Sequence, residues 1–232
     1  MIRPAQLMAV APLVAVMALL SSAWPQTKSM TQGAHRMELM LERLDGSTWK
    51  AIDPALVLAH GDRVRFRFRT NFDGYLYVTN QSTSGKYDQL FPRNETGQDN
   101  HVVSGKDYQV PATAFAFRID GPPGHEVVYW LVSPVKLNDT PARPALPAGG
   151  NTPPLTLMPR CDDGVMKARG DCVDTSAGPK LIPRDVDVAK DLAAANAASR
   201  ELLFVREQNT AVISSQAPLT GPIIYEFQLA HR

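Results

Sequence analysis

Hydrophobic and polar residues alternate with a period of two along several short stretches of the chain. The clearest stretch is residues 63–70, where Val64, Phe66 and Phe68 are separated by arginines. Such alternation is typical of a β-strand that buries one face. The other face would then carry Arg63, Arg65, Arg67 and Arg69. These arginines could bind an anion or a polysaccharide, but a solvated strand face, or an edge protected by positive charge, is the simpler interpretation.

Further strands follow from similar alternation, from short apolar runs and from the turns between them. The segment "NFDGYLYVTNQSTSGKYDQLFP" reads as a turn, a strand at residues 75–79, a loop, and a partner strand that Pro92 ends. Residues 35–52 begin with a predicted strand that ends at the turn "LDGS", with a helix as the alternative. The other predicted strands lie in a short pair around residues 104–106, and at 115–117, 127–132, 202–206, 211–215 and 223–229. Turn signals every eight to twelve residues, as in immunoglobulin-like domains, predict an all-β fold, a β-sandwich.

The segment after residue 137 differs in composition from the strands around it. Six prolines between Thr140 and Pro159 indicate an extended connection. We expect residues 138–183 to be a long insertion and the alanine-rich residues 191–200 to form one short helix. The last three strands would complete the same sandwich, so that residues 35–232 form a single domain.

The N-terminus has the pattern of a secretory signal peptide over residues 1–23, followed by a flexible tail at 24–34. Arg3 precedes an apolar run from Leu7 to Leu20, and small residues follow at Ser21–Ala23. The apolar run is short for a membrane span, which needs roughly twenty residues, although an uncleaved anchor is an alternative. The sequence therefore predicts a periplasmic or secreted protein with no membrane span in the mature chain.

Cys161 and Cys172 are the only cysteines and flank "CDDGVMKARGDC". In an oxidising compartment such a pair most simply forms one disulfide. A zinc site would need further Cys or His ligands nearby, and a redox pair would more typically be Cys-x-x-Cys. The ring also gathers acidic side chains that could bind calcium, or could simply be solvated: Asp162, Asp163, Asp171 and Asp174.

Composition and motifs give little support to an enzyme or to a nucleic-acid-binding protein. The formal net charge of +1 lacks the concentrated basic field that phosphate binding requires. The "TSGKY" segment lacks the first glycine of a phosphate loop, and "HEVVYW" lacks the second histidine of a zinc protease. We predict no catalytic residue, cofactor or metal ligand, although a Ser/His/Asp triad assembled in space is not excluded by sequence.

Three motifs resemble the bacterial family catalogued as domain of unknown function 4384 (DUF4384). They are "GYLYVTNQSTSGKYDQLFP", "SGKDYQVP" and "FRIDGPPGHEVVYWLVS", and the resemblance covers about residues 60–135. Its matching elements are Gly74–Tyr77, Asn80, Ser84-Gly85, Leu90–Pro92, Gly105–Pro111 and Asp120–Glu126. The resemblance implies a β-sandwich of exported or envelope-associated proteins, without established activity, in which the matching residues look structural.

The function predicted from the sequence is a non-catalytic, exported module that binds another envelope or secreted protein or takes part in envelope assembly. An accessory subunit or regulator of a secreted enzyme is the first alternative, and a hydrolase is the second. Besides the four arginines, the binding surface could include Tyr75 and Tyr77, although core packing is the commoner use of such aromatic residues. An open sheet edge could also accept a strand from the partner.

Overall fold

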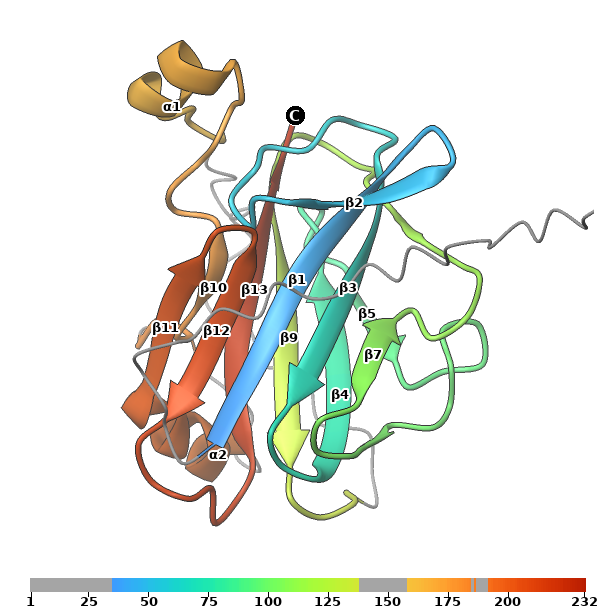
Figure 1. Cartoon of the computed structure of the whole chain (residues 1–232), viewed down its shortest axis with the longest axis vertical. Coiled ribbons are helices and arrows are strands. Elements are labelled where there is room, and N and C mark those ends of the chain that lie inside the picture. The colour runs from blue at the N-terminus through green and yellow to red at the C-terminus, as the bar shows by residue number, and fades with distance from the viewer. Residues whose placement is uncertain (1–34, 138–157, 185, 187–191) are drawn as a thin grey trace, which may run out of the picture.

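The computed structural model describes residues 35–137, 158–184, 186 and 192–232. Within them, two antiparallel sheets pack face to face as a β-sandwich, which confirms the predicted fold class (Figure 1). The predicted signal peptide and the predicted tail lie outside the described residues. No helix among the described residues is long and apolar enough to cross a bilayer.

The strands of the first sheet come from both ends of the chain and from its middle. They are β1 (His35–Asp45), β2 (Thr48–Ile52), β3 (Arg63–Thr70), β7 (Asp107–Val110), β8 (Phe117–Arg118), β11 (Leu202–Glu207) and β12 (Thr210–Ser215). Their order is β11-β12-β1-β3-β7, with β2 also paired to β1 and β8 to β3. The strand predicted to run from His35 to the turn "LDGS" is β1, and β2 pairs with it after that turn.

The second sheet is built mostly from the middle of the chain and is completed by its C-terminal strand. Its strands are β4 (Gly74–Gln81), β5 (Tyr87–Phe91), β6 (His101–Val102), β9 (Gly124–Ser133), β10 (Gly178–Lys180) and β13 (Ile223–His231). Their order is β10-β13-β9-β4-β5, with β6 also paired to β4. In Figure 1, β9 and β4 lie behind β1 and β3 of the first sheet.

The core lies between the sheets and follows the predicted alternation. On β3, Val64, Phe66 and Phe68 are buried as the period of two requires. Trp130 of β9 is fully buried opposite them, and its ring centroid lies 5.2 Å from that of Phe66. Each such side chain stabilises the fold by about 1.5–3 kcal/mol through burial. The main core therefore joins the two sheets.

Two short strands flank residues 104–106 as predicted, but they do not pair with each other. β6 pairs with β4 in the second sheet, whereas β7 pairs with β3 in the first. The turn between them is held by a hydrogen bond from the Gly105 amide to the Thr70 carbonyl oxygen at 2.8 Å. The turn signal was read correctly, but this turn carries the chain from one sheet to the other.

The C-terminal part confirms three predicted strands and one predicted helix. The strands are β11, β12 and β13, and the helix is α2 (Ala193–Ala198), followed by the 3₁₀ turn η2 (Ser199–Glu201). Two elements were not predicted: helix α1 (Asp163–Arg169), inside the ring that the cysteines close, and the edge strand β10. The described part of the expected insertion therefore adds a strand to the second sheet.

Candidate functional site

A cavity of about 380 Å³ opens between the two sheets at one end of the sandwich. Its floor is formed by Phe66 of β3, Val128 of β9 and Leu229 of β13. Its rim is formed by the loop between β4 and β5 and by the turn between β8 and β9. The volume lies within the range of small-ligand pockets, roughly 300–1,000 Å³.

Glu126 and Asn80 place polar groups beside this apolar floor. Asn80 pairs with Val128 across β4 and β9, so Glu126 is its diagonal neighbour on the inner face. The Asn80 Nδ2 atom donates a hydrogen bond to Glu126 Oε2 at 3.2 Å. Burial raises the pKa of Glu126 to about 7; the hydrogen bond from Asn80 opposes the shift, and the nearby Asp120 adds to it. The carboxyl group is therefore half ionised near neutral pH.

Two buried oxygen atoms at the cavity have no hydrogen-bond partner. They are Asn80 Oδ1 and Thr83 Oγ1. The amide nitrogen of the Asn80 side chain donates to Glu126, but its oxygen is unpaired. Thr83 is only 8% exposed, and a Cβ atom added to Gly121 would come within 3.2 Å of its hydroxyl. An unpaired buried polar group costs about 1–3 kcal/mol, so a ligand that satisfied these atoms would regain that free energy.

The charged side chains at the rim are already paired with one another. Lys86 Nζ lies 2.9 Å from Asp88 Oδ2, and Arg118 Nε lies 3.2 Å from Asp120 Oδ1. All four are well exposed at their side chains. Among the described residues, no cation forms an ion pair with Glu126. The cavity therefore presents acceptor groups and one unbalanced acid.

The family model described as a domain of unknown function (DUF4384) matches residues 57–136. The chain contains a DUF4384 domain. The match confirms the resemblance that the motifs indicated. Comparisons with curated proteins and with solved structures found no match.

Several residues that carry the resemblance to DUF4384 proteins line the cavity, although they come from separate motifs. They are Asn80, Ser84, Leu90, Asp120, Gly121 and Glu126. The sequence indicated a structural role for them, and Asn80 and Glu126 do join two strands. Their convergence could not be predicted, because it depends on the register between β4 and β9.

The arginines and tyrosines of the predicted binding surface are not brought together by the fold. The arginines lie on the outer face of the first sheet, and the tyrosines on the outer face of the second. Tyr77 is 5% exposed, and its hydroxyl accepts a hydrogen bond from the Leu137 amide at 2.9 Å. Tyr75 is partly buried, with its ring 5.1 Å from that of His101.

Acidic residues of β1 pair with three of the four arginines. Arg65 lies 2.6 Å from Glu42, Arg67 lies 3.6 Å from the same carboxylate, and Arg69 lies 3.0 Å from Glu38. Arg63 is exposed at the start of β3. The arginine-rich face is therefore largely matched by charges within its own sheet.

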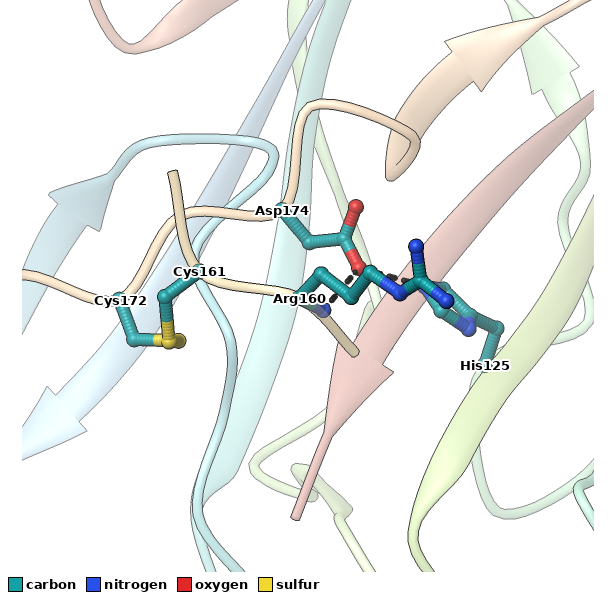
Figure 2. The surroundings of a disulfide bond; sticks show 5 residues. All are labelled: His125, Arg160, Cys161, Cys172 and Asp174. Carbon is teal, nitrogen blue, oxygen red and sulfur yellow. Dashed lines mark hydrogen bonds and ion pairs between the residues drawn. A yellow bond between two sulfur atoms is a disulfide. The ribbon is translucent and has the colours of Figure 1, made fainter. Parts of the chain in front are cut away.

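The predicted disulfide between Cys161 and Cys172 is present (Figure 2). It closes the ring that contains α1, and Cys172 packs against Val57 and Ala230. Beside the disulfide, Asp174 Oδ2 accepts a hydrogen bond from the Arg160 amide at 2.8 Å and lies 3.2 Å from His125 Nε2 (Figure 2). The bridge and this carboxylate together attach the ring to the second sheet.

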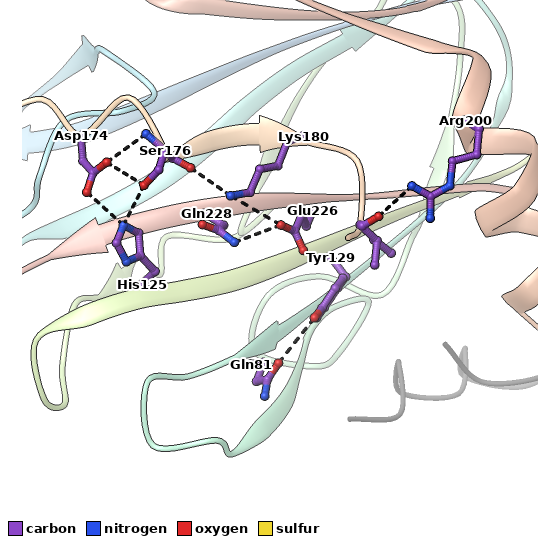
Figure 3. Close-up of polar contacts among 10 residues, drawn as sticks. Gln81, His125, Tyr129, Asp174, Ser176, Lys180, Arg200, Glu226 and Gln228 are labelled. Atoms are coloured by element: carbon purple, nitrogen blue, oxygen red, sulfur yellow. Dashed lines mark hydrogen bonds and ion pairs between the residues drawn. The ribbon is translucent and has the colours of Figure 1, made fainter. Parts of the chain in front are cut away.

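His125, Asp174 and Ser176 lie together but lack the geometry of a nucleophilic triad (Figure 3). In a triad, the carboxylate and the hydroxyl bind opposite ring nitrogens. Here both contact Nε2 of His125, at 3.2 and 3.5 Å, and the Ser176 hydroxyl donates to Asp174 at 2.6 Å. Burial opposes ionisation of Asp174, but hydrogen bonds from Ser176 and the Arg160 amide outweigh it and lower the pKa. Sequence reasoning missed this cluster, because its members are distant in the chain.

A second polar group lies on the outer face of the second sheet (Figure 3). Glu226 accepts a hydrogen bond from Gln228 at 3.0 Å and lies 3.8 Å from Lys180, whose Nζ also donates to the Ser176 carbonyl oxygen. Burial raises the pKa of Glu226 to about 7 and lowers that of Lys180. Burial therefore outweighs the attraction between the two charges.

The acidic side chains of the disulfide ring are not arranged as a calcium site in the described residues. Asp162 caps α1 by accepting a hydrogen bond from the Val165 amide, and Asp174 is engaged as above. Within the described part of the chain, no three acidic, His or Cys side chains lie close enough to hold a metal ion together.

Proposed function

We propose that this DUF4384 protein is an exported, non-catalytic binding module whose ligand site is the cavity between the sheets. The ligand would be a group presented by another envelope or secreted protein. An open cavity with an apolar floor and a few convergent polar groups is the usual form of a binding site. The engagement of the Ser176 hydroxyl by Asp174, rather than by His125 alone, supports a role without nucleophilic catalysis.

The observation that carries this proposal is a pair of buried oxygens, Asn80 Oδ1 and Thr83 Oγ1, that belong to residues lining the cavity and have no hydrogen-bond partner among the described residues. Buried polar atoms without a partner are rare in native proteins, and each calls for an explanation. A ligand group that binds in the cavity and pairs with these oxygens is such an explanation.

The disulfide supports the exported location, because such bridges persist in oxidising compartments. Export predicts that the mature protein, purified from the envelope of its host, begins near residue 24. Mass spectrometry of the intact chain measures this directly. A chain that retains Met1 and fractionates with the cytoplasm would contradict the proposal of export.

The proposed site is tested by narrowing the cavity without altering the core. Ser84 is exposed on the rim, so Ser84→Trp fills space there at little cost to the fold. Ser104→Trp is the matched control, because Ser104 is exposed in the turn between β6 and β7 and does not line the cavity. Circular dichroism first establishes that both variants are folded.

Affinity capture from the host envelope then compares the wild type with both variants. We expect the wild type and Ser104→Trp to recover the same partner, and Ser84→Trp to recover at least tenfold less. Equal recovery by Ser84→Trp, or no specific partner for the wild type, would overturn the proposed site. Turnover of an ester or peptide substrate by the purified protein would overturn the non-catalytic role.

A further inference from the structure

The chemistry of the cavity indicates the class of group that it binds. Three residues from three segments line it and carry oxygen groups: Glu126 with its carboxyl, and Asn80 and Thr83, whose Oδ1 and Oγ1 atoms are buried. The orientation of Asn80 is fixed by its donation to Glu126, so its free atom is an acceptor. A complementary ligand must therefore supply donors to Asn80 Oδ1 and to the ionised Glu126 carboxylate, and the Thr83 hydroxyl can accept a further one.

The charges around the cavity favour a cationic donor. Lys86 and Arg118 are each compensated by an aspartate at the rim, so the cavity holds no free cation that would attract an anion. Glu126 has no cationic partner among the described residues, and the charged group that shifts its pKa is another acid, Asp120. A positive charge placed here would restore balance to a partly buried carboxylate.

The apolar floor indicates that the part of the ligand that carries the donor group is apolar. Phe66, Val128 and Leu229 lie beneath the polar groups, and Leu90 and Phe117 also line the space. An ammonium group carries three N–H donors, which matches three acceptors, and an aliphatic stem suits apolar walls.

We propose that the cavity binds a protonated primary amine on an aliphatic stem, held by Glu126, Asn80 and Thr83. This inference rests on the proposed binding function and specifies its ligand. The amine is either a free small molecule or the lysine side chain of a partner protein, and both present the same group to the cavity.

Binding of the amine is coupled to loss of a proton from Glu126. Burial holds the pKa of this carboxyl at about 7, and an adjacent ammonium favours the ionised form. Below pH 7 the amine must displace a proton to bind, whereas above it the carboxylate is already charged. The other titratable groups lining the space are Lys86, Asp88, Arg118 and Asp120.

Calorimetric titration of the full chain with pentylamine tests the inference, with 1-pentanol as the neutral isostere. We expect pentylamine to bind at least tenfold more tightly than 1-pentanol. We also expect pentylamine to bind at least about tenfold more tightly at pH 8 than at pH 5.5. Glu126→Gln should weaken pentylamine binding at least tenfold and flatten its pH dependence. The matched control is Glu201→Gln, because Glu201 is exposed in η2 and does not line the cavity.

A lysine peptide with blocked termini separates the two sources of the amine. Tighter binding of the peptide than of pentylamine assigns the site to a partner's lysine, in agreement with the proposed function. Equal or weaker binding assigns it to a free amine, which supports this inference but contradicts a ligand presented by another protein. Equal binding of pentylamine and 1-pentanol, no pentylamine binding by the wild type, or unchanged binding by Glu126→Gln would overturn the inference. The Ser84→Trp capture experiment is independent of these titrations, so the inference can fail while the proposed binding function stands.

Discussion

Glu126 connects the stability of the protein to pH as well as to its proposed ligand. Burial raises its pKa from 4.5 to about 7 in the folded state, so the folded protein binds this proton more tightly than the unfolded chain. The favourable contribution of the protonated carboxyl is fully present below pH 4.5 and is lost as pH rises toward 7. At pH 8 the ionised carboxylate is a net cost to folding.

We therefore expect Glu126→Gln to stabilise the ligand-free protein at pH 8 and to change little at pH 4.5. The amide keeps an acceptor for Asn80 and removes the charge, for a gain of about 1–3 kcal/mol in the free energy of unfolding. Urea denaturation of both proteins at the two pH values measures this difference. A loss of stability at pH 8 would show that Glu126 is better solvated than its position indicates.

Glu42 illustrates the opposite case, in which a buried acid is well compensated. It is 5% exposed and lies 2.6 Å from Arg65 and 3.6 Å from Arg67. Glu42→Gln would leave two neighbouring guanidinium groups with a weaker acceptor. We expect a loss of about 1–2 kcal/mol in the free energy of unfolding, seen as a lower urea midpoint with an unchanged slope.

Glu95→Gln is the matched control for Glu42, because its pair with Arg93 is exposed on both sides. Surface pairs of this kind contribute about 0–1 kcal/mol. A loss from Glu95→Gln as large as that from Glu42→Gln would contradict the assignment of stability to burial of the pair.

At the scale of elements, the disulfide ring attaches α1 and the segment after it to the sandwich. In the chain-entropy model, closing so short a ring stabilises the folded state by about 2–3 kcal/mol. Replacing Cys161 and Cys172 together by alanine should lower the free energy of unfolding by that amount. Alanine at both positions leaves no thiol that could form a wrong disulfide. The unfolding of the double variant, by heat or by urea, can therefore be compared directly with that of the wild type.

Reduction of the wild type provides the control for that double variant. Dithiothreitol should bring the wild type to the stability of the double variant and should not affect the double variant itself. If the reduced wild type unfolds at the same urea concentration as the oxidised protein, the ring does not stabilise the fold.

The elements that were predicted from sequence are those whose pattern is long enough to repeat. Alternation over β3 determined both the strand and its buried face, and alternation over β13 determined the strand, whereas β10 has three residues, one of them proline. Helix α1 spans a single short segment, and its only signals were the capping residues Asp162 and Gly170. The turn at Gly105 looked local, but only the assembled sheets show that it joins one to the other.

The cavity could be predicted only in part. Asn80 and Glu126 occupy positions that alternation assigns to the inner faces of their strands, in line with Val78 and Val128. A polar residue in such a position is a signal that sequence reasoning can detect. Their proximity could not be detected, because register between strands that are distant in sequence depends on the whole sheet.

At the scale of the molecule, the DUF4384 match covers only one side of each sheet. Residues 57–136 include β3 and β9, but their neighbours β1 and β13 lie outside the match. Phe66 packs against Phe227 of β13, with ring centroids 5.2 Å apart. Trp130 stacks on Tyr225 of the same strand at 6.5 Å. The central core is therefore covered by residues from both ends of the described chain.

We expect a fragment of residues 57–136 to be unfolded, because β3 would lose β1 and β9 would lose β13. Removing these strands exposes the aromatic core, and each large side chain that it uncovers costs about 1.5–3 kcal/mol. A chain of residues 35–232 retains every described strand and is the control, which should unfold cooperatively with a blue-shifted tryptophan emission at the start. Circular dichroism, thermal unfolding and amide NMR dispersion compare the two. A cooperative transition and a dispersed spectrum from residues 57–136 alone would show that the matched segment is a self-sufficient domain, and that the flanking strands are additions to it rather than parts of its core.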